Sequence, residues 1–288
     1  MRINSRSGFT VIEVVLFLAV TGLMMAGILA SVGNGLHGQN YREGVNELRN
    51  KIQGQYDKVY SLTNNRSESL DPCTASGSPE RGTSNCLYVG RMIHFNAPSG
   101  GSGSSLTIYP VVAELKPGLG GTSTGNRFDG NLSTVADTYT YEIDNYRISV
   151  WTGEPSLTEE YSFAWGLTGY EPSPSGPGFS PVSLDIVDSL LILRSPADGS
   201  VRSYKIPDRS QIYNHATPRD LASDVFNGTT ALTNPQVNDE LVVCLVDEDR
   251  IGNFSTPMAV KIAGAATGPG DIETISNTLL AERGMPQC

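Results

Sequence analysis

Residues 8–32 read GFTVIEVVLFLAVTGLMMAGILASV, and this stretch decides how the rest of the chain is organised. The apolar run from Phe9 to Val32 contains a single ionisable side chain, Glu13. A helix needs about 20 apolar residues to cross roughly 30 Å of hydrocarbon. Arg2 and Arg6 precede the run without any acid, a positive-inside bias that predicts a cytoplasmic N-terminus. The sequence therefore predicts a single-pass precursor in the cytoplasmic membrane, with everything after the run outside.

Two ordinary explanations of this run are less satisfactory. A cleaved secretory signal has a shorter apolar core followed by a small-residue cleavage site, and neither is found here. A plain membrane anchor is the simpler alternative, but it leaves Glu13 unexplained. An ionised carboxylate in hydrocarbon costs at least ~2.5 kcal/mol, so Glu13 needs a partner.

The segment Gly8-Phe9-Thr10-Val11-Ile12-Glu13, directly after the basic leader, resembles the prepilin motif of the type IV pilin and pseudopilin superfamily. The resemblance implies that a prepilin peptidase cuts between Gly8 and Phe9, and that Phe9 is then N-methylated. It also implies that Glu13 acts in assembly, neutralising the Phe9 amine of a neighbouring subunit where low dielectric makes an unpaired charge costly. The implied partners are other pilin subunits in a helix bundle and the inner-membrane assembly machinery, and the implied destination is an extracellular filament or the cell surface.

A second helical pattern follows the apolar run. Apolar side chains recur every three or four residues, which is typical of one face of an amphipathic helix; they are Tyr41, Val45, Leu48, Ile52, Tyr56, Val59 and Leu62. We therefore predict one long helix from Phe9 to about Leu62, with its second half buried against a head. Glycines in the run, and between residues 33 and 38, are compatible with close helix packing or with local melting.

Beyond residue 63 the pattern predicts an antiparallel β-rich head with long Gly/Ser/Pro loops, so the fold class is α+β. Short runs rich in Val, Ile and Tyr alternate with turn residues. The predicted strands are Leu87–Phe95, Leu106–Leu115, Tyr139–Trp151, Leu190–Ser195, Val201–Ile206, Glu240–Val246 and Met258–Ile262. A short helix is predicted from Asp271 to Arg283, with Asp271 as its N-cap. The predicted parts are a leader (1–8), a transmembrane and assembly half (9–32), an amphipathic half (33–63) and the head (64–288).

Four cysteines, Cys73, Cys86, Cys244 and Cys288, predict disulfides, because an even count in an exported chain is typical of an oxidised protein. Three connectivities are open from the sequence. We predict Cys73–Cys86, which closes a short flexible loop, and Cys244–Cys288, which ties the last residue to a predicted strand. The second is similar to the C-terminal disulfide-bounded loop of many pilins.

Other candidate sites are weaker. Asp247 and Asp249 are weak candidates for calcium, but their spacing lacks the alternating oxygens of an EF-hand, and a solvated turn is the simpler interpretation. Asp185 and Asp188, with Asp198, do not predict an acid pair of defined separation. His94 and His215 follow no nucleophile elbow. The aromatic residues Trp151, Tyr161, Phe163, Trp165 and Tyr170 predict either a surface platform or, more simply, core.

The acidic balance, with a net charge of -10, argues against nucleic-acid binding. The sequence thus predicts a structural subunit, major or minor, of a type IV pilus or related filament, with no enzymatic activity and no cofactor. The alternative is a low-copy minor pilin or pseudopilin whose head binds a surface or host-cell ligand, or belongs to a secretion pseudopilus. A membrane-anchored extracytoplasmic enzyme is a further alternative.

Overall fold

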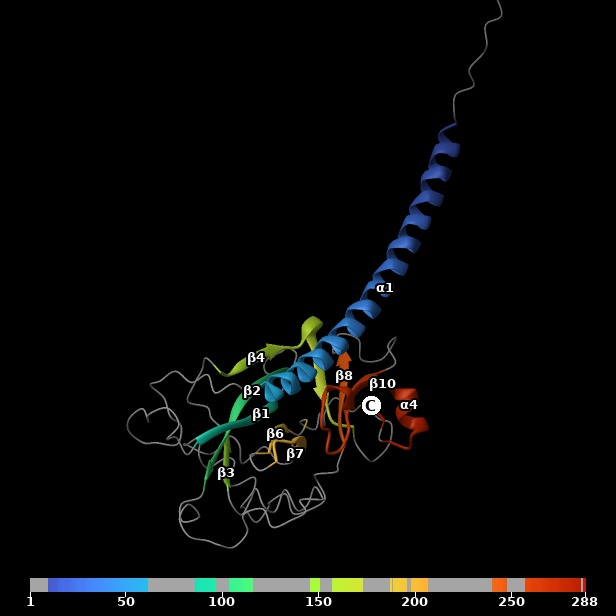
Figure 1. Cartoon of the computed structure of the whole chain (residues 1–288). Coiled ribbons are helices and arrows are strands. Elements are labelled where there is room, and N and C mark those ends of the chain that lie inside the picture. The colour runs from blue at the N-terminus through green and yellow to red at the C-terminus, as the bar shows by residue number, and fades with distance from the viewer. Residues whose placement is uncertain are drawn as a thin grey trace, which may run out of the picture. The chain divides into compact units, whose positions relative to one another are not determined.

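The computed structural model describes residues 10–61, 86–96, 104–115, 146–150, 157–172, 187, 189–195, 198–206, 240–247, 257–285 and 287–288. The fold is α+β, with an N-terminal apolar helix and two antiparallel sheets (Figure 1). The chain divides into two compact units, Met1–Glu43 and Gly44–Cys288, and the division falls within the first helix. We call the second of these the head unit.

Helix α1 runs from Val11 to Tyr60. Its first part, Val11–Leu29, has a mean hydropathy of 2.4 and is 0% buried within the molecule. The glycines between residues 33 and 38 lie inside the helix, so the backbone is helical through them. The helix ends two residues before Leu62, the predicted end, which lies outside the described residues.

The predicted apolar stripe of α1 is buried. Each of its described members is exposed by 6% or less: Tyr41, Val45, Leu48, Ile52, Tyr56 and Val59. The intervening side chains Asn46, Glu47 and Asn50 are exposed. This is the pattern expected when one face of a helix is removed from water and the opposite face is solvated.

The first sheet has the strand order β3-β2-β1-β6-β7, and a further strand, β4, pairs with β2. These strands are β1 (Cys86–Asn96), β2 (Ser105–Leu115), β3 (Tyr146–Val150), β4 (Glu159–Ser162), β6 (Ser189–Arg194) and β7 (Val201–Ile206). Five of them were predicted, with bounds within a residue or two except at β3, for which the structure describes only part of the predicted range. β4 pairs with the Ser105–Ile108 part of β2, and β3 pairs with the Val111–Leu115 part.

The second sheet has the strand order β10-β9-β8-β5. Its members are β5 (Leu167–Tyr170), β8 (Leu241–Asp247), β9 (Met258–Ile262) and β10 (Ile272–Ser276). β8 and β9 were predicted. Both are nearly continuous apolar runs, and their buried residues Val243 and Val260 are each 0% exposed.

The predicted helix Asp271–Arg283 is wrong in its first half. Ile272–Ser276 forms strand β10, which pairs with β9, and only Asn277–Glu282 forms a helix, α4. The β-branched residues of β10 favour a strand once a partner strand supplies hydrogen bonds. Asp271 instead ends a 3₁₀ turn, η4 (Pro269–Asp271), and accepts hydrogen bonds from the Thr267 and Gly268 amides. The N-cap of α4 is Ser276, whose hydroxyl accepts from the Leu279 amide.

The short strands β4 and β5 were not predicted, and they link the two sheets. Between them lies a 3₁₀ turn, η1 (Ala164–Gly166). Ser104 holds this connection: its carbonyl accepts from the Phe163 amide, and its amide donates to the Leu167 carbonyl, both at 3.0 Å. On the other side, the Ser203 amide of β7 donates to the Ala266 carbonyl at 3.0 Å. Among the described residues, main-chain hydrogen bonds therefore tie the first sheet to β5 of the second sheet and to the connection between β9 and β10.

Candidate assembly segment and helix contacts

The first turn of α1 carries Glu13. The amides of Glu13 and Val14 donate to the Thr10 carbonyl at 3.1 and 3.2 Å, so the helix begins directly after Thr10. The Glu13 side chain is exposed, and so are the apolar side chains around it. A carboxylate at a helix N-terminus is favourably placed relative to the helix dipole. Gly8 and Phe9, the predicted cleavage pair, lie outside the described residues.

The segment Val11–Leu29 is long and apolar enough to cross a membrane, a criterion that a signal sequence near an N-terminus also meets. Its exposed side chains include Phe17, Leu23, Met25 and Leu29, each exposed by more than 60%. Thr21 satisfies its hydroxyl within the helix by donating to the Phe17 carbonyl at 2.8 Å. Exposed apolar surfaces of this size are typical of segments that contact lipid or other protein.

In the head unit, α1 makes polar contacts with the connection before β10. The Arg49 side chain donates to the Ile272 carbonyl at 3.1 Å, and the Gln53 amide donates to the Pro269 carbonyl at 2.8 Å. The Tyr60 hydroxyl donates to the Thr267 carbonyl. These bonds hold η4 and the start of β10 against the helix.

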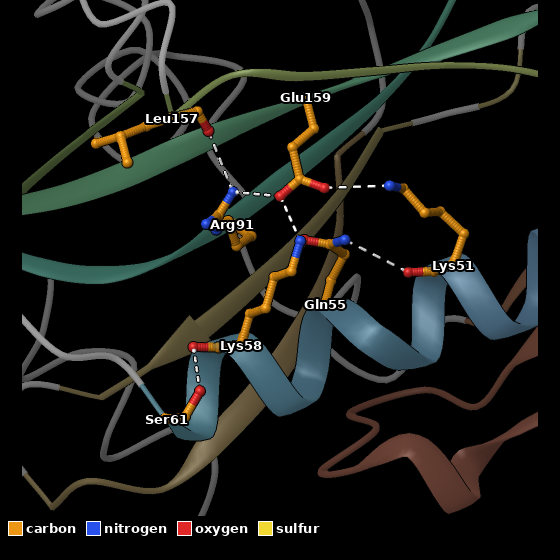
Figure 2. Close-up of polar contacts among 7 residues, drawn as sticks. All are labelled: Lys51, Gln55, Lys58, Ser61, Arg91, Leu157 and Glu159. Carbon is orange, nitrogen blue, oxygen red and sulfur yellow. Dashed lines mark hydrogen bonds and ion pairs between the residues drawn. The ribbon is translucent and has the colours of Figure 1, made fainter.

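A cluster of charges joins α1 to β4 and β1 (Figure 2). The Glu159 carboxylate on β4 lies 3.1 Å from the Lys51 ammonium and 2.5 Å from that of Lys58, both on α1. It also lies 3.1 Å from the Arg91 guanidinium on β1, which donates in addition to the Leu157 carbonyl. Three cations thus share one carboxylate that is about three-quarters buried.

This arrangement determines the protonation of Glu159. Burial alone would raise its pKa, but hydrogen bonds from Lys58 and Lys51, together with the charges of Lys58 and Arg91, outweigh burial and lower the pKa below its ordinary value. Glu159 is therefore a stable anion at neutral pH. Sequence analysis did not identify it, because its cationic partners lie 68 to 108 residues away in the chain.

The contacts of residues 159–167 follow α1 in the antiparallel direction. Glu159 contacts Lys58 and Lys51, and the Lys51 ammonium lies 5.7 Å from the centre of the Tyr161 ring. Further along, Leu167 approaches Gly44, where an added Cβ would lie 2.6 Å from the Leu167 Cδ1. Gly44 therefore permits this connection to lie close against the helix.

The predicted disulfide Cys244–Cys288 is present, with a Cα–Cα distance of 5.5 Å. It links β8 to the C-terminal residue, whose amide also donates to the Asn277 side chain at 2.7 Å. Both sulfurs lie in an apolar cluster that includes Tyr170, Ile275 and Leu280. Burial raises the pKa of Tyr170 to about 12. Cys73 and the side chain of Cys86 lie outside what the structure describes, so their pairing stays a prediction.

Some of the remaining candidate residues lie outside the described part of the structure, and others have structural roles. Asp249, Asp185, Asp188, His215 and Trp151, together with the side chain of Asp247, lie outside the described residues. Within the described ranges, no group of three His, Cys, Asp or Glu side chains is placed to hold a metal ion. Asp198 accepts from the Ser200 amide at 2.8 Å and pairs with Arg202, which is the role of a turn carboxylate.

Two aromatic candidates and one histidine are core residues. Phe163 and Tyr170 are buried, whereas Trp165 is 57% exposed and Tyr161 is half-buried. The His94 Nδ1 lies 2.9 Å from the Ser189 hydroxyl, a pair that the sequence did not reveal. Both side chains are 1% exposed or less, so this pair is inaccessible to a substrate.

Comparison with known proteins adds no identification, because no family model, curated protein or solved structure matches this chain.

Proposed function

We propose that this chain is a structural subunit of a type IV pilus or a related filament, made as a membrane precursor and assembled through the first part of α1. The observation that carries the proposal is the exposed apolar segment Val11–Leu29 with Glu13 in its first turn. In this proposal the segment is held in the membrane before assembly and packs against other subunits afterwards. The subunit acts by assembling and catalyses no reaction.

The chemistry of Glu13 supports this choice over a plain anchor. A carboxylate among apolar side chains is costly unless a cation neutralises it. Cleavage between Gly8 and Phe9 would create a cationic amine four residues before Glu13, and the amine stays cationic when methylated. On a neighbouring subunit, that amine would pair with Glu13 inside a dry bundle and fix the register between the two helices.

The contacts of the second part of α1 support the proposal that this one helix both anchors the chain and forms the central support of the head. Its apolar stripe is buried, and Arg49, Gln53 and Lys58 bond to other elements of the head unit. In the proposal, these bonds transmit a force that acts on the assembled helix to the head. The oxidised Cys244–Cys288 pair supports an extracytoplasmic location.

Intact-mass measurement of the membrane-extracted protein tests this proposal. We expect loss of residues 1–8, with the mass of a methyl group added to Phe9, in cells that contain a prepilin peptidase. Gly8→Val should leave the precursor uncut, because a branched side chain crowds the peptidase cleft, whereas Ser7→Ala is the matched control and should be processed. A mature chain that starts at Met1, or one cut after residue 30, would overturn the proposal.

A second candidate is a low-copy minor pilin whose head binds a surface or another molecule. The size of the region after the helix, residues 64–288, favours it, because it is large for a repeating structural unit. Counting this chain against the other subunits in purified filaments distinguishes the two. A few copies per filament support the minor subunit, and a majority share supports the main structural subunit.

A further inference from the structure

The connection between β9 and β10, residues 263–271, joins parts of the head unit that are distant in the sequence. Its Ala266 carbonyl accepts from the Ser203 amide at 3.0 Å and from the Ser203 hydroxyl at 3.2 Å, and Ser203 lies on β7 of the first sheet. Its Thr267 carbonyl accepts from the hydroxyl of Tyr60, the last residue of α1. At this connection, therefore, α1 and the first sheet are both bonded to the second sheet.

The carboxylate of Asp271 organises the inside of the connection. Its Oδ2 accepts from the Thr267 amide at 2.7 Å, from the Gly268 amide at 3.1 Å and from the Thr267 hydroxyl at 3.3 Å. The Asp271 carbonyl also closes the base of the connection by accepting from the Ala263 amide at 3.1 Å. Hydrogen bonds to an ionised oxygen are stronger than those between neutral groups. Two consecutive amides are thus held facing inward, toward one side chain.

The geometry of the peptide group converts these inward amides into outward carbonyls. In a trans peptide group the N–H and the C=O lie in one plane and point in opposite directions. The Thr267 amide shares its peptide group with the Ala266 carbonyl, and the Gly268 amide shares its peptide group with the Thr267 carbonyl. When Asp271 holds both amides inside, both carbonyls must point outward. They are the two carbonyls to which β7 and α1 donate.

The backbone just before these peptide groups is set by its surroundings. Ala265 has a φ of 53°, which is the left-handed region, and this region is uncommon for a residue other than glycine. Such a conformation persists where the surrounding structure imposes it. Ala265 packs against the apolar cluster of the first sheet, and Ala266 is buried. Contacts with other elements, rather than local preference, therefore determine the shape of this connection.

We infer that Asp271 is a positioning residue that couples α1 and the first sheet to the second sheet, because its one carboxylate aims both of the carbonyls that these elements bind. Neither of the two outward bonds includes an atom of Asp271, yet loss of its carboxylate should release both together. The inference goes beyond the proposed function and does not depend on it, since all the contacts that carry it lie within the head unit.

A double-mutant cycle on the detergent-extracted full chain tests the bond to α1. Tyr60→Phe removes only the hydroxyl, and in the parent it should raise the unfolding equilibrium constant about three- to tenfold. In Asp271→Ala the same change should have an effect of less than about twofold, because the Thr267 carbonyl is no longer aimed at Tyr60. Asp271→Asn keeps an oxygen that accepts from the two amides, so the effect of Tyr60→Phe should return in that background.

Gln53→Met is the matched control for the cycle. Gln53 also donates from α1 to this connection, but its acceptor at 2.8 Å is the Pro269 carbonyl, whose peptide group contains neither of the amides that Asp271 holds. The effect of Gln53→Met on the unfolding equilibrium constant should therefore be the same in the parent and in Asp271→Ala.

Hydrogen exchange resolved to single amides tests the bond to the first sheet. The Ser203 amide should exchange about tenfold faster in Asp271→Ala than in the parent, because its acceptor has turned away. The Asn277 amide, which donates to the Pro257 carbonyl at the other end of the β9 and β10 pair, should exchange at the parent rate.

Three results would overturn the inference. One is an equal effect of Tyr60→Phe in the parent and in Asp271→Ala, or an unchanged exchange rate at Ser203. Another is loss of the Gln53→Met effect as well, which would mean that the whole connection has unfolded. The third is an Asp271→Asn chain that behaves like Asp271→Ala. If Asp271→Ala does not fold, Asp271→Ser replaces it with the same expectations, because the shorter side chain cannot reach both amides.

Discussion

At the scale of single residues, Glu159 and Gly90 are positions at which the sequence alone gives no warning of their importance. Glu159 is one of the acidic residues of an acidic chain, yet it has two lysines and an arginine as partners. Gly90 lies at a β-bulge in β1, where the register with β2 shifts between Tyr88 and Gly90. An added Cβ there would lie 2.2 Å from the Ile192 carbonyl oxygen, so a backbone atom on β6 occupies the space that a side chain needs.

Replacing Glu159 with glutamine should weaken the attachment of β4 to α1. Glutamine keeps the shape but leaves Lys51, Lys58 and Arg91 close together without an anion. We expect a loss of about 1 kcal/mol in the free energy of unfolding, measured by urea denaturation of the detergent-extracted chain. Lys58→Gln is the comparison, and it should cost less, because Glu159 then keeps two cations. Equal stability of Glu159→Gln and the parent would contradict this prediction.

The same carboxylate predicts a dependence on pH. Its folded-state pKa is lower than the ordinary value of 4.5, so the unfolded chain takes up the proton first as the pH falls. The contribution of Glu159 to stability is therefore complete above about pH 4.5 and is lost as the pH falls through the lower, folded-state pKa. Between pH 5 and pH 2, the difference in unfolding free energy between the parent and Glu159→Gln should shrink toward zero. A difference that stays constant over this range would refute the explanation.

Gly90→Ala should destabilise the head by about 3 kcal/mol, because the new methyl group can be accommodated only if β1 and β6 move apart. Gly54→Ala is the control. Nothing lies within 4 Å of a Cβ at Gly54, which is on α1, so this change should stabilise by about 0.5–1 kcal/mol through helix propensity. Thermal unfolding of both variants measures the contrast, and a Gly90→Ala protein as stable as the parent would be inconsistent with the close approach of these strands.

At the scale of elements, the C-terminal segment is attached in two ways. β10 pairs along its whole length with β9, whereas α4 is held by one buried side chain, Leu280, and by the residues that follow it. The disulfide between Cys244 and Cys288 fastens those residues to β8. The two elements should therefore respond differently when the disulfide is removed.

We expect Cys244→Ala/Cys288→Ala to lose ~4 kcal/mol of stability, from the loop that the disulfide closes across a sequence separation of 44. Hydrogen exchange should show faster exchange of the α4 amides, while the β10 amides keep their protection because their partner strand remains. Equal loss of protection in α4 and β10 would mean that the disulfide holds the whole segment rather than its end.

At the scale of the whole molecule, the proposed function assigns folding and assembly to different parts of the chain. Glu13 belongs to the unit Met1–Glu43, and the sheets and the disulfide belong to the unit Gly44–Cys288. The polar bonds of α1 from Arg49 onward lie within the second unit. A change at Glu13 should thus affect the filament and leave the head intact.

Glu13→Leu should leave the melting temperature of the head unchanged. If the proposed function holds, it should also reduce filament formation at least tenfold, because the Phe9 amine of a neighbouring subunit would then have no anion in the dry bundle. The measurement is the amount of this chain in sheared filaments relative to its total amount in the cells. Val20→Leu, an apolar replacement in the same segment, is the control and should assemble normally. Assembly of Glu13→Leu at the parent level would show that the acid has no docking role.

Local patterns in the sequence predicted much of the fold. The heptad-like spacing from Tyr41 to Val59 marks the buried face of α1, and alternating β-branched runs mark strands such as β7 and β9 with the correct bounds. The Asp198-Gly199 turn before β7 follows from the positive φ that glycine permits. These features could be predicted because periodicity, propensity and turn chemistry act between residues that are neighbours in the chain.

What only the tertiary structure decided depends on partners that are distant in sequence. Ile272–Ser276 has helical spacing, but a hydrogen-bonding partner in β9 makes it a strand. β4 and β5 are too short to be recognised alone, and they exist because β2 and β8 offer them free edges. The Glu159 cluster likewise arises where α1, β1 and the connection between the sheets meet. The apolar segment and Glu13 could be recognised from the sequence because their pattern does not depend on a partner elsewhere in the fold. Strand pairing and side-chain packing, in contrast, depend on which surfaces the fold brings together.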